Sequence, residues 1–119
     1  MPNAQAKKYD LEERTAKFGE DVITFCQRMP RNNITDPLVD QLVRAATSVG
    51  ANYCEADDAE SKKDFKHKLG ICKKEPRESK HFLRMLAVAL PEPKDNLRLL
   101  WQEAKELNLI FNAIYRKVS

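Results

Sequence analysis

Four stretches of this chain repeat apolar residues at intervals of three and four, with capping or helix-breaking residues between them. This spacing places the apolar residues along one side of an α-helix, and no stretch shows the alternation typical of a strand. A chain of 119 residues can fold as one domain on its core alone. Short connections between consecutive helices favour an antiparallel up-down-up-down bundle. We therefore predict an all-α four-helix bundle over residues 11–119, preceded by a flexible arm over residues 1–10.

Capping residues and prolines set the expected helix boundaries. Asp10 is the expected N-cap of the first helix, which should end at Pro30. Asp36 is expected to cap the second helix, with Pro37 in its first position, and Ser61 is expected to cap the third. The expected core seams are Leu11, Thr15, Phe18, Val22, Phe25 and Met29; Leu38, Leu42, Ala45, Val49, Tyr53 and Ala56; Phe65, Leu69, Cys72, Ser79, Leu83 and Leu86; and Leu97, Leu100, Ala104, Leu107, Phe111, Ile114 and Val118.

Pro76 falls inside the third predicted helix, on its core seam. A proline there removes one backbone hydrogen bond and costs roughly 3 kcal/mol relative to alanine. We predict a kink at Pro76. The alternative is a break at Glu75 that divides the segment into two helices and makes a five-helix protein.

The charge of the chain is unevenly placed. The net charge is only +3, but the segment from Ser61 to Arg84 carries a large excess of Lys and Arg over acids. An advance of about 100° per residue brings six of these cations within roughly 60° of arc, about a third of a turn from the apolar seam, so we expect them to face solvent. This basic stripe comprises Lys62, Lys66, Lys73, Arg77, Lys80 and Arg84.

A basic stripe on a helix attracts phosphate, so the first functional hypothesis is binding to the backbone of RNA or DNA. Lys7 and Lys8 of the arm could add to it. The sequence carries no signature of an RRM, a KH domain, a zinc knuckle or a helix-turn-helix, which predicts weak sequence specificity. The alternative is that these lysines only solvate one face of the bundle.

The sequence gives little support for metal-dependent or nucleophilic catalysis. Cys26, Cys54 and Cys72 are odd in number and lack CxxC spacing, which indicates reduced core residues and a cytoplasmic location. A di-iron bundle needs two Glu-x-x-His pairs, and the pair formed by Glu78 and His81 has no match on another helix. We expect no cofactor, no metal and no catalytic residue. No apolar run approaches the roughly 18 residues that span a bilayer.

Surplus apolar surface indicates self-association. The last helix is apolar over more than half of its circumference, and the second helix has an additional face of small residues that permits close helix approach. We therefore expect an oligomer. The residues that widen the last seam are Leu99, Trp101, Ile110 and Tyr115, and the small-residue face comprises Val39, Val43, Ala46, Gly50 and Cys54.

The amino-acid sequence of four stretches resembles that of one bacterial family. They are DLEERTAKFGEDVI, PLVDQLVRAATSVGANYCEA, KLGICKKEPRESKHFLRML and QEAKELNLIFNAIYRK. The chain resembles the four helix bundle proteins, also called 23S rRNA intervening-sequence proteins, and departs from them at Pro76. It is distantly similar to the accessory protein of diversity-generating reverse transcriptases, which binds nucleic acid and the polymerase through a basic surface.

This resemblance implies a bundle that assembles as a ring, a homopentamer in related proteins, without an established enzymatic activity. Together with the basic stripe, it leads to the hypothesis of a non-enzymatic ring that binds nucleic acid. The alternative is a structural adaptor whose partner is a protein such as a polymerase or a ribonucleoprotein.

Overall fold

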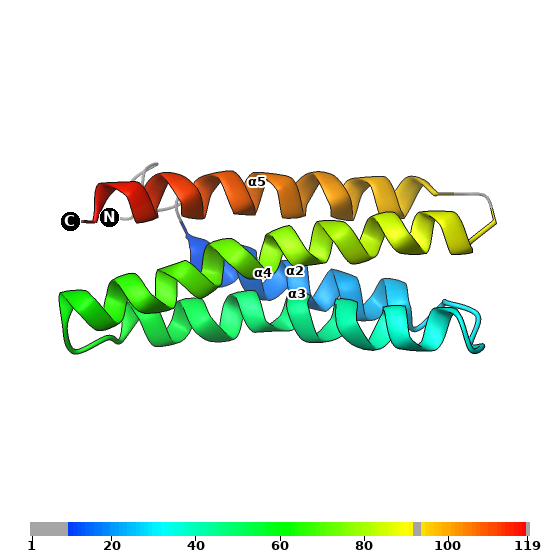
Figure 1. Ribbon diagram of the computed structural model, residues 1–119, viewed down its shortest axis with the longest axis horizontal. Coiled ribbons are helices and arrows are strands. Elements are labelled where there is room, and N and C mark those ends of the chain that lie inside the picture. The colour runs from blue at the N-terminus through cyan, green and yellow to red at the C-terminus, as the bar shows by residue number, and fades with distance from the viewer. Residues whose placement is uncertain (1–9, 92–93, 119) are drawn as a thin grey trace.

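The computed structural model describes residues 10–91 and 94–118, and within them the chain forms four helices and no strand. The helices are α2 (Leu11–Cys26), α3 (Thr35–Asp57), α4 (Lys62–Ala89) and α5 (Asp95–Lys117). Figure 1 shows consecutive helices running in opposite directions along the 44 Å long axis. The predicted all-α four-helix fold is confirmed. Lys7, Lys8 and nearly all of the expected arm lie outside the described residues.

Each helix packs on its neighbours in the sequence, and α2 also meets α5, with a smaller interface. The predicted seams supply the core, because most of their residues are buried and the others pack against its edge. Among the described residues, no helix is long and apolar enough to cross a membrane. The largest fully buried side chains include Phe18, Leu42, Leu69, Leu83, Leu86, Leu107 and Phe111.

Two of the three predicted caps are confirmed. The Asp10 carboxylate accepts a hydrogen bond from Glu13 N at 3.2 Å, and Ser61 Oγ accepts one from Asp64 N at 3.0 Å. Two boundaries differ from the prediction. The first helix ends at Cys26, well before Pro30, and the second begins at Thr35.

Asp36 is not the cap of α3, which corrects the prediction. The Asn32 side-chain oxygen accepts hydrogen bonds from Ile34 N and Thr35 N, both at 2.9 Å, and the Asn32 carbonyl accepts from Asp36 N. These bonds are those of an N-cap, so Asn32 satisfies the free amides at the start of this segment. Asp36 instead pairs with Arg31.

Pro76 is buried inside α4, which runs unbroken from Lys62 to Ala89, so the alternative of two separate helices is wrong. The missing amide leaves the Cys72 carbonyl without its helical donor. One turn later, Ser79 Oγ donates to the Glu75 carbonyl at 2.9 Å, a pattern that often bends helices. The kink stays a prediction.

The small-residue face of α3 is used inside the bundle at Gly50. A Cβ atom there would lie 3.3 Å from Thr15 Oγ1 and 3.5 Å from Ala16 N of α2. On α2, a Cβ atom at Gly19 would lie 3.5 Å from the Thr47 Cα atom. Two glycines thus allow α2 and α3 to approach closely.

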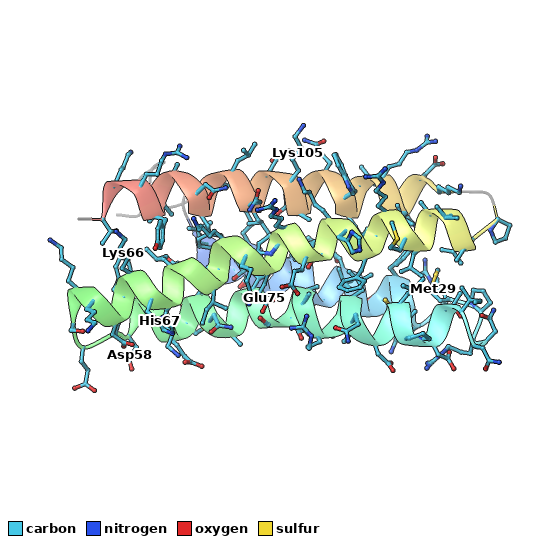
Figure 2. All side chains as sticks on the ribbon, in the orientation of Figure 1. Met29, Asp58, Lys66, His67, Glu75 and Lys105 are labelled. Atoms are coloured by element: carbon cyan, nitrogen blue, oxygen red, sulfur yellow. The ribbon has the colours of Figure 1, made fainter. Side chains whose placement is uncertain are left out.

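Ion pairs between helices lie at the edges of the core. Arg14 of α2 donates to both oxygens of Glu103 on α5, at 2.8 Å each, and also to Glu106 at 2.9 Å. Arg44 of α3 contacts Glu78 of α4 at 2.8 Å, and at 3.5 Å it reaches Glu75 of α4, whose side chain is only 8% exposed. Figure 2 shows Glu75 on the side of α4 that faces α3.

Candidate nucleic-acid interface

Part of the basic stripe lies along the line where α4 and α5 meet. Lys66, Lys73 and Lys80 are seven residues apart on α4, and Trp101, Asn108 and Tyr115 are seven residues apart on α5. Residues at this spacing return to the same side of a helix, so two antiparallel helices can bring such sets into register. Figure 2 shows Lys66 between the two helices.

Contacts between side chains join the two sets. The Lys66 and Lys73 ammonium groups lie 4.9 Å and 4.2 Å from the centre of the Tyr115 ring, within the range of a cation–π interaction. Asn108 Nδ2 donates to the Lys73 carbonyl at 2.6 Å. This hydrogen bond fixes the middle of the register.

The Trp101 indole is the second aromatic contact of the stripe. The Lys80 ammonium lies 5.3 Å from its ring centre, and Lys105, which comes from α5 itself, lies 5.7 Å away. Each aromatic ring is therefore close to two ammonium groups. Lys105 adds a cation from α5 to those of α4.

This arrangement corrects the expectation that the whole stripe faces solvent. Lys62, Arg77 and Arg84 are exposed, but Lys66, Lys73 and Lys80 are half-buried against α5. The reason is that α5 packs beside the stripe, and the aliphatic stems of lysines cover apolar surface while their charged ends reach water.

Positive and negative charges lie on different sides of these two helices. Glu75 and Glu78 of α4 pair with Arg44 on α3, whereas Glu103 and Glu106 of α5 pair with Arg14 on α2. Across residues 10–91 and 94–118, no carboxylate forms an ion pair with any of the six stripe residues. Within the described part of the chain, the six cations of the stripe are therefore not compensated by ion pairs.

Sequence reasoning missed three residues of this surface: Trp101, Tyr115 and Lys105. The two aromatic residues had been interpreted only as surplus apolar surface. Their seven-residue spacing relative to Asn108 was a signal, because it matches the spacing of the three lysines. Which lysine would face which ring depended on the pairing of α4 with α5.

The remaining candidates from the sequence were metal ligands and cysteine nucleophiles. Within the described part of the chain, no three His, Cys, Asp or Glu side chains gather as metal ligands. Cys26 and Cys72 are buried, and burial raises the pKa of these thiols to about 11 and about 12 respectively. Cys54 is exposed, contrary to its expected place in the core.

Comparison with known proteins places the chain in a family. No curated protein matches it. A solved structure of a protein with unknown function from the S23 ribosomal protein family of Bacteroides thetaiotaomicron is 23% identical, covering 89% of this chain and 98% of that one, with a TM-score of 0.77. That likeness concerns the fold. The model of the 23S rRNA-intervening sequence protein family matches residues 7–113, and the chain belongs to this family.

Proposed function

We propose that this protein binds the phosphate backbone of RNA or DNA through the surface between α4 and α5, without enzymatic activity. The observation that carries the proposal is the separation of charge, because four glutamates of the two helices pair with arginines of α2 and α3 while the basic stripe pairs with none of the described carboxylates. An anion of similar length can contact such a row of cations at several points at once. A nucleic-acid backbone has that form.

The half-buried lysines are compatible with this role. A cation–π contact is worth between about 0.5 kcal/mol when exposed and about 2 kcal/mol when desolvated, so Lys66, Lys73 and Lys80 can exchange an aromatic ring for a phosphate at modest cost. Arg77 and Arg84 are exposed and need no rearrangement. Contacts of this kind position a nucleic acid without reading its sequence.

The test is fluorescence anisotropy of labelled single-stranded and duplex oligonucleotides over a series of salt concentrations. The variant is Arg77→Glu with Arg84→Glu, which spares the lysines that pack on the rings. The matched control, called the α2 control, is Lys17→Glu with Arg28→Glu, which makes the same charge change at two exposed positions, one in α2 and one just after its end. Circular dichroism checks that both variants fold.

We expect the α4 variant to bind much more weakly than wild type. The slope of log K against log salt should fall by about 1.4 to 1.8, since each phosphate contact contributes about 0.7 on single strands and 0.9 on duplex DNA. The α2 control should keep most of the wild-type affinity. Equal losses in the two variants, or no binding by wild type at low salt, would refute the proposal.

We further propose that the protein is cytoplasmic and that its copies assemble into a ring, a homopentamer. Leu99 and Leu109 of α5 are 69% and 57% exposed, and Val88 of α4 is 84% exposed, which leaves apolar surface for an interface. Sedimentation equilibrium at micromolar concentration measures the mass. A monomer there would contradict this proposal.

The same exposed apolar residues favour the alternative function, a structural adaptor that binds a polymerase or a ribonucleoprotein. Binding to nucleic acid and binding to protein make different predictions for the exposed leucines. Leu99→Ser with Leu109→Ser should weaken the capture of a protein partner or the assembly of copies. It should leave unchanged what each phosphate contact contributes to the slope of log K against log salt.

A further inference from the structure

A groove lies between α4 and α5 beside the Trp101 indole. Its lining residues are Arg84 and Ala87 from α4 and Leu97, Arg98, Trp101 and Gln102 from α5. Leu97 is buried, and Ala87 is partly buried against the core, so the floor of the groove beside the indole is apolar. Arg84 and Arg98 are exposed and come from the two helices that form the groove.

The charged residues in the lining of this groove are both cations, and one carboxylate, that of Glu106, lies next to it, bonded to Gln102 at 3.1 Å. Lys80 and Lys105 lie 5.3 Å and 5.7 Å from the Trp101 ring centre, and no described carboxylate pairs with Arg84 or Arg98. Three other grooves differ, because each has carboxylates in its lining. Those carboxylates belong to Asp21; to Glu12, Glu13 and Glu20; and to Glu78.

An aromatic ring within a cationic surface fits the chemistry of an unpaired nucleotide. A base stacks on an aromatic side chain, while guanidinium groups on either side bind the phosphates that flank it. Bases inside a duplex already stack on each other and have no free face for the ring. The Gln102 amide nitrogen donates to Glu106 at 3.1 Å, and its second N–H and its oxygen can bond a base edge.

We propose that this groove binds an unpaired nucleotide of a nucleic-acid strand, with the base stacked on Trp101 and the flanking phosphates on Arg84 and Arg98. The inference rests on the proposed nucleic-acid binding and specifies its ligand as single-stranded. Lys80 and Lys105 leave the indole when the base arrives and bind neighbouring phosphates.

The test uses the indole itself, because Trp101 is the single tryptophan of the chain. Wild-type protein is titrated with three probes of equal length: oligothymidylate, the same strand without bases, and a duplex. Tryptophan fluorescence reports contact with the ring, and anisotropy of a label on each probe reports binding. Trp101→Leu and Trp101→Phe are then measured by anisotropy, with Tyr115→Leu as the matched removal of an aromatic ring outside the groove.

We expect oligothymidylate to quench Trp101 fluorescence and to bind about 5- to 150-fold more tightly than the strand without bases, the range that one stacked base supports. Trp101→Leu should remove this difference, and Trp101→Phe should keep most of it. If both strands bind equally and neither quenches the indole, the nucleotide site is refuted while backbone binding stands. If no probe binds at low salt, the proposed function fails as well. The fluorescence of wild type decides between these outcomes even if a variant fails to fold.

Discussion

Arg14 is the main polar connection between the first and last helices, and removing its charge should loosen that contact. Its guanidinium donates to both oxygens of Glu103 at 2.8 Å and to Glu106 at 2.9 Å. The ion pairs raise the pKa of Arg14, chiefly through the hydrogen bond to Glu103. The perturbation is Arg14→Met, which keeps an apolar stem against the bundle and deletes only the charged head.

The expected loss of stability in Arg14→Met follows from the geometry and the exposure of the ion pair. The side chains of Arg14 and Glu103 are 31% and 30% exposed, so water screens their interaction as in a surface pair. Surface pairs contribute about 0.2–1 kcal/mol, and bidentate geometry places this one at the upper end. We expect Arg14→Met to lower the free energy of unfolding by about 1 kcal/mol, and Tm by about 4 °C for a chain of this length.

The assay is urea unfolding followed by circular dichroism for wild type, Arg14→Met, Glu103→Gln and the double variant. This double-mutant cycle isolates the coupling between the two side chains. The coupling should be about 1 kcal/mol at low salt and shrink in 1 M salt, where the Debye length is about 3 Å. A coupling below about 0.2 kcal/mol at low salt would refute the argument that this pair holds α2 to α5.

Three further predictions concern stability and thiol chemistry. Asn32→Ala should destabilise the protein by about 1–2 kcal/mol, because its side chain accepts from two free amides, and urea unfolding measures this. Gly50→Val should cost about 1–3 kcal/mol by overpacking against α2, visible as a lower Tm. Native protein at pH 8 should react with iodoacetamide at Cys54 and not at Cys26 or Cys72, as mass spectrometry would show. Because burial raises the pKa of these two thiols, their contribution to the free energy of unfolding should be complete below about pH 8.5 and lost as pH rises toward 11–12.

Each of these three predictions has a control. Asp36→Ala should cost less than Asn32→Ala, since Asp36 forms only an exposed ion pair, and the opposite order would restore Asp36 as the cap. Ala51→Val at an exposed neighbour should be nearly neutral, so an equal loss at both positions would exclude overpacking. Rapid labelling of Cys72 in folded protein, or stability that rises from pH 8 to pH 10, would contradict the assigned burial.

Much of the fold could be predicted because it depends on local physics. Apolar spacing along one helix determines which side it buries, and Leu83 or Phe111 stays on that side whatever the neighbouring helices do. Asp10 and Ser61 each bond an amide three residues away, so local sequence suffices for them. The cap of α3 was misplaced because Asp36, Pro37 and Asn32 all carry capping signals, and the turn at residues 30–34 selects among them.

The candidate site could be predicted in part. Residue spacing was enough to predict that the six cations of the basic stripe share one side of their helix. Their partners did not follow, because periodicity along α4 contains no information about which residues of α5 lie opposite. The expectation that the stripe faces solvent failed for Lys66, Lys73 and Lys80, each half-buried against α5.

The sequence by itself determined the four helices, the sides they bury and the helix that carries the positive charge, since these depend on residues within about one turn of each other. Tertiary structure decided that Glu78 of α4 and Glu103 of α5 pair with α3 and α2, and that Tyr115 and Trp101 meet the lysines of α4. The physical reason is that helix pairing and register arise from packing between segments distant in the chain. Only that packing forms the groove between α4 and α5 and places an aromatic ring of α5 beside the lysines of α4.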